Sequence, residues 1–395
     1  MKKKLKLALI VALLIAVIAV SFGILREHKA RNEEAAASTE SIASEQQEDE
    51  NDKPLATLFF ASDYQPEEGF DDPSETLSNI LDAAETDGKT IDRVIMCGDY
   101  SNVSKLYDYQ VSPDASIEEV KGIVSEECPQ AEEVLFVQGN HDMMTDQIAP
   151  SGLYESENYL IYILNTEEDF PWKQGKTAGC LTKVRKSSTA MKECFDELIR
   201  KGETRPAFIA GHVPLHFTAR TSSRHTTGDN LYSSLIFNVV NKAAESLDIV
   251  YLFGHDHSKG WDCYLGGSSV YKAKGDSVLI PRFEEDKINT DEYSQERLNF
   301  TYMNAGYSGY YMNCSPDEYN MDEPGLYDAA DSTLTGTVFE IYPDKIIVKR
   351  YDTDGAHVLG HAGEADPYKG GIDIGLIPEG SYSRETESPQ EIPLE

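Results

Sequence analysis

The sequence predicts an α/β fold, and three observations support this class. Short apolar runs alternate with longer stretches of helical periodicity over most of the chain, which is typical of strand–helix–strand units. Several of these runs stop at glycine, aspartate, asparagine or histidine, as buried strands do at the rim of an open sheet. With 395 residues, 40% of them hydrophobic, the chain can also bury a sizeable core.

The first predicted elements are a strand at about 55–61 and a helix that starts at Asp72-Pro73. Aspartate before proline is a typical helix start, because aspartate caps the helix and proline suits its first turn. Apolar residues then recur at helical spacing, at Leu77, Ile80, Leu81 and Ala84. We expect a strand at about 91–97 next, and then a helix near 116–127.

Further strands are expected at 134–137, 159–164, 206–210 and 249–253. A helix should precede each of the last two, one around Met191 to Ile199 and one over about 230–245. The rest of the chain is predicted to be β-rich, with a hairpin over 338–351.

Polar residues follow five of the apolar runs at the point where each run ends. These residues are Asp63-Tyr64-Gln65, Gly98-Asp99, Gly139-Asn140-His141-Asp142, Gly211-His212 and Gly254-His255-Asp256-His257. Because the carboxyl ends of strands in open α/β sheets form the usual binding edge, we expect these side chains to converge. Their oxygen and nitrogen donors are what a pair of divalent cations needs.

Taken in order, these five motifs resemble those of the metallophosphoesterase superfamily, which includes the calcineurin-like phosphoesterases. The resemblance covers about residues 55–350 and implies an αββα sandwich of two mixed sheets flanked by helices. It also implies a hydrolase that acts on phosphate ester bonds. One position departs from the family pattern, since Gln65 stands where the first motif usually has histidine.

The resemblance implies two divalent metal ions, with Mn, Fe, Zn and Mg all open. One ion would be held by Asp63, Gln65, Asp99 and His257, and the other by Asp99, Asn140, His212 and His255. An amide oxygen is a weaker donor than an imidazole nitrogen, so the first site is expected to bind less tightly or to prefer a hard ion such as Mn²⁺ or Mg²⁺. The alternative for Gln65 is a hydrogen-bonding polar group of the core.

The same resemblance makes His141 the general acid that protonates the leaving oxygen, while Asp142 would fix its tautomer and raise its pKa. Asp256 is expected to be structural. Residues of the polar segment after His212 are weaker candidates for substrate binding, the alternative being a merely solvated loop: His216, Arg220, Arg224 and His225.

The resulting hypothesis is a phosphohydrolase with a bridging hydroxide nucleophile, cleaving a phosphomonoester, phosphodiester or nucleotide outside the cell. The alternative is a surface binding module with the metallophosphoesterase fold and a degraded site, which Gln65 favours. The formal charge of −34 argues against nucleic acid as a partner, because a phosphate-backbone binder needs a basic surface. We therefore expect a small phosphorylated substrate, and the oligomeric state stays open.

The N-terminus predicts a membrane anchor or a signal sequence over residues 1–29. Lysines precede an apolar stretch from Leu7 to Leu25, which is long enough to span a bilayer once. The lysines would stay in the cytoplasm and the catalytic domain outside; the alternatives are secretion after cleavage and a buried core helix. Residues 30–54 are expected to form an acidic disordered linker, 55–365 the metallophosphoesterase domain, and 366–395 a mostly disordered acidic tail.

Overall fold

The computed structural model describes residues 53–66, 72–101, 112–165, 177–215, 233–255, 271–284, 287–307, 335–352, 355–356, 372–375 and 390–391. The chain divides into two compact units, Met1–Pro54 and Leu55–Glu395. No helix within the described ranges is long and apolar enough to cross a membrane. The apolar stretch 7–25 lies outside these ranges.

The first sheet of the second unit joins an N-terminal parallel half to a C-terminal antiparallel half. Its main order is β15-β14-β13-β1-β2-β3, with β12 paired to β13 and β16 to β14. Strands β1, β2 and β3 run parallel, whereas β13 and β14 are antiparallel to their neighbours. The strands are β1 (Ala56–Ala61), β2 (Arg93–Met96), β3 (Leu135–Phe136), β12 (Gly306–Tyr307), β13 (Thr335–Ile341), β14 (Lys345–Asp352), β15 (Gly355–Ala356) and β16 (Ile372–Gly375).

The second sheet has the order β4-β5-β6-β7-β11-β8. Strands β5, β6, β7 and β11 run parallel, and β4 and β8 close the two edges in antiparallel pairs. The strands are β4 (Gly152–Glu155), β5 (Leu160–Leu164), β6 (Ala207–Gly211), β7 (Ile249–Phe253), β8 (Tyr271–Lys272) and β11 (Thr301–Asn304).

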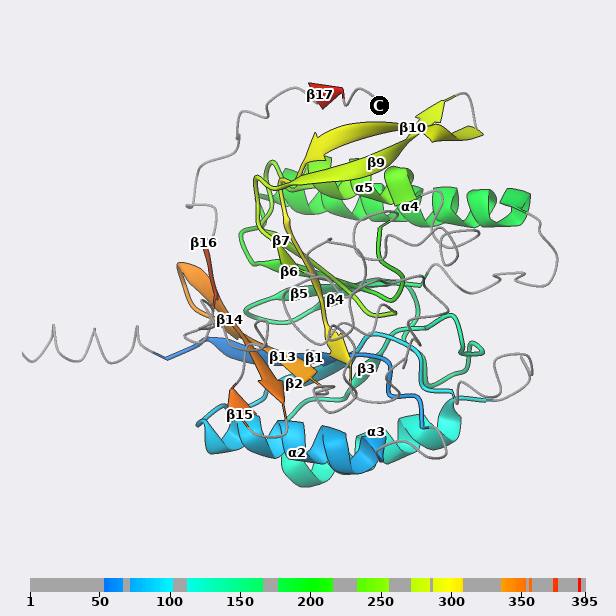
Figure 1. The fold of residues 1–395 in the computed structure, drawn as a ribbon. Helices are drawn as coiled ribbons and strands as arrows, with labels where there is room; N and C mark the ends of the chain where they lie inside the picture. Colours follow the sequence, from blue (N-terminus) through cyan, green and yellow to red (C-terminus); the bar gives the residue numbers. More distant parts are fainter. Residues whose placement is uncertain are drawn as a thin grey trace, which may run out of the picture. The chain divides into compact units, whose positions relative to one another are not determined.

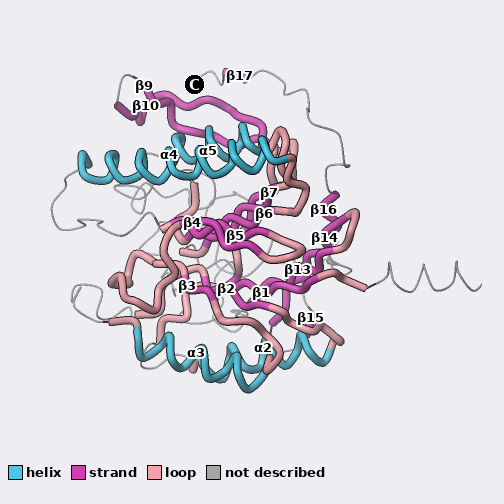
Figure 2. The backbone as a smooth tube through the Cα atoms, turned by 180° about the vertical axis from the view of Figure 1, so that it is seen from behind, coloured by secondary structure: helices cyan, strands magenta, loops and turns pink. Residues whose placement is uncertain are grey.

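Two helices cover the outer face of each sheet (Figures 1 and 2). Helices α2 (Pro73–Thr86) and α3 (Asp114–Glu127) lie on the first sheet, and α4 (Thr177–Lys201) and α5 (Ser233–Ala243) lie on the second. The resulting layers are helix, sheet, sheet and helix, so the predicted αββα sandwich is confirmed. A hairpin of β9 (Ser277–Glu284) and β10 (Lys287–Arg297) packs on α5, and β17 (Gln390–Glu391) pairs with β10.

The core between the two sheets is aromatic at its centre. Phe60 of β1 stacks on Phe208 of β6 with ring centroids 5.7 Å apart, and both meet Phe339 of β13 edge-on. All three rings are fully buried, and such offset and edge contacts favour one relative placement of the sheets. This packing fixes how the strand ends of one sheet face those of the other.

The predicted strands and helices are present, but α4 begins at Thr177, well before the helix expected around Met191 to Ile199, and β4 was not predicted. Asp72 caps α2 by accepting the N–H of Ser74 at 2.9 Å, as the Asp-Pro start predicts. The hairpin predicted over 338–351 is formed by β13 and β14. The prediction gave no bounds for β9 and β10, and the short strands β16 and β17 lie in the range expected to be mostly disordered.

Candidate metal centre

Each predicted metal ligand in the described ranges follows the carboxyl end of a strand. Asp63 comes after β1, Asp99 after β2, Asn140 after β3, His212 after β6 and His255 after β7. The strands within each half are parallel, and the ends of the two halves meet, because the ligand atoms of Asp99, His212 and His255 lie within 4.8 Å of one another. Two βαβαβ halves therefore supply one site.

The Asp99 carboxylate is the meeting point of this site. Its Oδ2 lies 3.2 Å from His212 Nε2, 3.1 Å from Gln65 Nε2 and 3.7 Å from His141 Nε2. Asp99 is 1% exposed. One carboxylate oxygen that several nitrogens approach has the place expected of a ligand shared between two cations.

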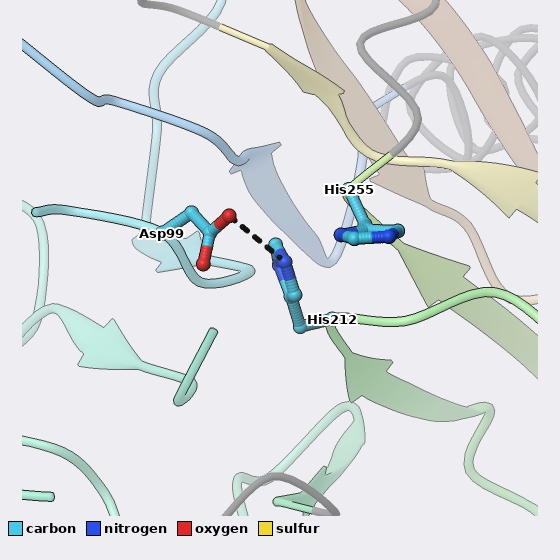
Figure 3. A group of neighbouring side chains, drawn as sticks. All are labelled: Asp99, His212 and His255. Atoms are coloured by element: carbon cyan, nitrogen blue, oxygen red, sulfur yellow. Dashed lines mark ion pairs between the residues drawn. The ribbon is translucent and has the colours of Figure 1, made fainter. Parts of the chain in front are cut away.

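Asp99, His212 and His255 form a group able to hold a metal ion. Their ligand atoms all lie within 4.8 Å of one another, and all three residues are buried. Figure 3 shows the His212 ring between the other two side chains, with the ion pair to Asp99 marked. Asn140 joins them, since its Oδ1 lies 2.9 Å from His212 Nε2. The structure thus brings together one complete predicted ligand set.

The hydrogen bonds of His212 fit a cation at this position. Its Nδ1 lies 2.7 Å from the Cys97 carbonyl oxygen, which only accepts, so Nδ1 carries the hydrogen. That leaves Nε2 facing the oxygens of Asn140 and Asp99. A nitrogen lone pair and two oxygens that converge need a positive charge between them, either a metal ion or a proton.

Without a metal, the site draws a proton instead. Burial lowers the pKa of His212, but the Asp99 carboxylate outweighs it and raises the pKa to about 10. Burial raises the pKa of Asp99, while His212 and His141 lower it more, and the net pKa lies below the usual range. The metal-free pair is therefore an imidazolium and a carboxylate, and the proton on His212 takes the place that a metal cation would have beside Asp99.

The backbone at three of these positions is left-handed. Among the described residues, Asp63 (φ 52°), Asp99 (φ 60°) and His255 (φ 69°) are the non-glycine residues with positive φ. Aspartate and histidine tolerate this conformation better than most side chains, but it still costs on the order of 1–3 kcal/mol each. Strain confined to predicted ligands indicates a functional site.

Two glycines let neighbouring strand ends approach closely. A Cβ on Gly139 would lie less than 3.0 Å from the backbone of Asp99, and one on Gly254 would lie equally close to Ser62 and Asp63. Only glycine fits such a gap without moving the backbone. The glycines of the motifs therefore set the distance between ligands.

His141 lies at the rim of the group rather than within it. Its side chain is 12% exposed, whereas those of His212 and Asp99 are 0% and 1% exposed. Its backbone N–H donates to Asp99 Oδ1 at 2.9 Å. The imidazole therefore stays near the Asp99 carboxylate and is still partly open to solvent.

Asp142 does not hold His141 through any hydrogen bond seen in the described ranges. Its carboxylate accepts the backbone N–H groups of Asp99, Tyr100, Ser101 and Gly139. Burial raises its pKa to about 6, with Asp99 adding to the rise and the N–H groups of Tyr100 and Gly139 opposing it. The residue ties the loop after β2 to the loop after β3, which differs from the role predicted from the sequence.

A family profile described as calcineurin-like phosphoesterase matches residues 56–259, more than half of the chain. The chain belongs to this family. It is accordingly a hydrolase that acts on phosphate ester bonds, in a family that uses divalent metals. The matched range contains all five motifs of the sequence analysis.

Solved structures similar to this phosphoesterase include a dimetal phosphatase from Danio rerio, with 10% identity over 78% of this chain and 100% of that chain and a TM-score of 0.43. Another is GAP50, the anchor in the inner membrane complex of Plasmodium, with 11% identity over 83% and 91% and a TM-score of 0.40. The family assignment rests on the profile match alone. No match was found among curated proteins.

The other predicted ligand set of the phosphoesterase is described only in part. Asp63 is fully buried, and its Oδ2 accepts the backbone N–H of His255 at 2.9 Å. Gln65 is 1% exposed and donates from Nε2 to Asp99. Its buried Oε1 has no hydrogen-bond partner in the described part of the chain. His257, Asp256 and the candidates His216, Arg220, Arg224 and His225 lie outside the described residues.

Sequence reasoning missed two buried residues behind the phosphoesterase site. Ser62 precedes Asp63 and contacts its carboxylate, and Arg350 of β14 is 0% exposed. A signal for Arg350 was present, because Ile346, Val348 and Arg350 alternate along a strand and so share one face. A charge on an otherwise apolar strand face indicates a buried polar network.

Proposed function

We propose that this protein is an extracellular metal-dependent phosphohydrolase with two divalent cations at the centre around Asp99. The observation that carries the proposal is Asp99 Oδ2, a buried oxygen approached by His212 at 3.2 Å, Gln65 at 3.1 Å and His141 at 3.7 Å. A bridging carboxylate is what holds two cations close together. Its substrate would be a phosphomonoester, a phosphodiester or a nucleotide.

In this proposal Asp99, Asn140, His212 and His255 hold one cation, and Asp63, Gln65, Asp99 and His257 hold the other. The buried Gln65 Oε1 supports the second set, because a buried carbonyl oxygen without a donor is costly and a cation would satisfy it. An amide oxygen favours hard ions, so Mn²⁺ or Mg²⁺ is the proposed occupant at that position.

Two divalent cations, when bound, would neutralise the phosphoryl oxygens and supply an activated water. The protein's own residues do the rest. The imidazole of His141 would donate a proton to the leaving oxygen, and its partial exposure beside Asp99 supports this role. Asp142 holds the loop that carries His141 against the loop of Asp99. The proposed ligands with positive φ, and the glycines that let their strand ends pack closely, keep the donor atoms in place before a substrate binds.

The extracellular placement rests on the sequence. Lysines precede the apolar stretch 7–25, which supports a single-pass anchor with the catalytic domain outside, or secretion after cleavage. Within this proposal residues 30–54 act as a spacer, 55–365 as the catalytic domain and 366–395 as an acidic tail. A net charge of −34 favours a small phosphorylated substrate over nucleic acid.

The second candidate is a binding module with this fold and a degraded site. The hydrogen bond from Gln65 to Asp99 favours it, because this amide also satisfies the carboxylate without a metal. The convergence of Asp99, His212 and His255, with Asn140 beside them, favours the enzyme instead, since a binding module has no need of a metal-ligand set.

The test uses the full chain in detergent, without a His tag and stripped of metal. Hydrolysis of an aryl phosphomonoester and an aryl phosphodiester is followed as Mn²⁺ is added back, for the wild type, Asp99→Asn and His141→Ala. We expect Mn²⁺-dependent turnover that falls about 10²-fold or more in both variants, with metal binding retained in His141→Ala. A wild type that binds no Mn²⁺ would refute the enzyme and support the binding module.

A further inference from the structure

The chain crosses from one sheet to the other beside the metal centre. Strand β11 of the second sheet ends at Asn304, and β12, which pairs with β13 of the first sheet, begins at Gly306. We call residues 304–306 the crossing turn. The Ala305 N–H donates to the carbonyl oxygen of Phe253 at 2.7 Å, and the Gly306 N–H donates to Asn304 Oδ1 at 2.7 Å.

Arg350 supports the crossing turn from within the core. Its Nη2 donates to the Asn304 carbonyl oxygen at 2.5 Å, and its Nη1 lies 3.3 Å from both Asn304 Oδ1 and Thr335 Oγ1. The residue is 0% exposed, and Asn304 and Thr335 are equally buried. A guanidinium in such a place is tolerated only where hydrogen bonds replace its water, so its geometry is tightly set by the turn.

The crossing turn in turn supports Ser62. Ser62 Oγ lies 2.7 Å from the Gly306 carbonyl oxygen and also contacts Asp63 Oδ2. A Cβ on Gly254 would collide with both Oγ and Cβ of Ser62, so the serine is enclosed on that side as well. Its hydroxyl therefore stays between the turn and the aspartate.

These contacts fix the direction of the Asp63 carboxylate. Asp63 Oδ2 receives the His255 N–H at 2.9 Å and touches the Ser62 hydroxyl. The Ser62 hydroxyl has one hydrogen; donated to Asp63 Oδ2, it holds this oxygen together with the His255 N–H and so sets the direction of Oδ1. Mutation of a residue that orients a metal ligand by a hydrogen bond typically lowers the metal affinity about 10–100-fold.

We propose that Ser62 and Arg350 are positioning residues of the metal centre: Arg350 holds the crossing turn, the turn holds Ser62, and Ser62 orients Asp63. This inference rests on the proposed role of Asp63 as a ligand of one of two cations. It assigns a function to a serine and an arginine that would otherwise serve only the stability of the core.

The test measures Mn²⁺ binding to the metal-free full chain in detergent by titration calorimetry, together with its melting temperature. In Ser62→Ala we expect the affinity for one equivalent of Mn²⁺ to fall about tenfold or more and that for the other to stay within about twofold. Excess Mn²⁺ should restore turnover. The matched control is Ser188→Ala in α4, which removes a buried hydroxyl bonded to Arg185 O at 3.0 Å and to none of the predicted ligands that the structure describes.

Arg350→Met should lower the affinity for the same equivalent of Mn²⁺ and also lower the melting temperature. Since this variant can fail to fold, Arg350→Lys serves as the second variant, because lysine keeps the charge but not the planar fork. Unchanged affinities in folded Ser62→Ala and Arg350→Lys would overturn the inference while leaving the proposed function intact. A wild type that binds one equivalent would overturn the inference together with the two-cation centre, and one that binds none would refute the proposed metal-dependent hydrolase altogether.

Discussion

The carboxylate of Asp142 accepts the backbone N–H of Asp99 at 2.8 Å, although the two residues lie at the ends of different strands. The same carboxylate binds the N–H of Gly139 at 2.9 Å. One side chain therefore holds Asp99 and the loop that carries Asn140 and His141 in a fixed relation. These hydrogen bonds are present in the metal-free protein, so the two loops are already held together before a cation binds.

Removing this carboxylate should lower stability more than it alters the chemistry of His141. Asp142→Ala leaves four buried N–H groups without an acceptor, so we expect a loss of about 3 kcal/mol or more in the free energy of unfolding. Asp142→Asn should lose less, because the amide oxygen still accepts. Urea unfolding of the metal-free protein measures this. A variant of normal stability whose pH–rate profile is shifted would show instead that Asp142 acts on His141.

Metal binding should release a proton from His212 at mildly alkaline pH. The Asp99 carboxylate raises the pKa of His212 to about 10 when no metal is present, so at pH 8 the ring is protonated and must lose its proton to bind a cation. Calorimetric titration with Mn²⁺ in two buffers of different ionisation enthalpy should show release of about one proton. Release of none would place the metal elsewhere.

The same shift predicts the pH dependence of stability in the metal-free protein. A raised pKa contributes stability that is fully present below pH 6.5 and is lost as the pH rises towards 10. The melting temperature of the metal-free protein should therefore fall between these values. The Mn²⁺-loaded protein should not lose stability through this group, and His212→Gln should remove the dependence.

Gln65→His should tighten the weaker of the two proposed cation sites. Imidazole nitrogen is the stronger donor for transition metals, so we expect the gain to be larger for Zn²⁺ than for Mn²⁺. Metal content after desalting, together with binding isotherms, measures this. Gln65→Met should weaken the same equivalent. If both variants bind both ions like the wild type, Gln65 is a core polar group and not a ligand.

Gly254→Ala should disturb the centre, because the added Cβ would lie within 3.0 Å of Ser62 and Asp63. We expect a lower melting temperature and weaker Mn²⁺ binding. Gly122→Ala in α3 is the control, since its Cβ would meet nothing within 4 Å. Alanine is the better helix former by about 0.8–1.0 kcal/mol, so this control should raise the melting temperature. Equal behaviour of the two variants would contradict the close approach at Gly254.

The sequence predicted the strand ends well and the directions of side chains poorly. Asp99, Asn140, His212 and His255 could be placed together because parallel strands share an edge. Asp142 could not be placed in this way, because adjacency to His141 in the chain says nothing of where its carboxylate turns. The positive φ of Asp63, Asp99 and His255 could not be predicted, because none of them is a glycine. Ser62 and Arg350 depend on the crossing turn, which brings together segments more than 200 residues apart in the sequence.

The division of the ligands between two sheets has a consequence for unfolding. Asp63, Asp99 and Asn140 come from the first βαβαβ half, and His212 and His255 from the second. A bound cation is therefore a cross-link between halves that also share the apolar core between the two sheets, which includes Phe60 and Phe208. Ligands that bind only the folded chain add stability in proportion to the logarithm of their concentration. Chelation should accordingly loosen the two halves from each other before either half melts, so that loss of the ion reduces the cooperativity of unfolding as well as the activity.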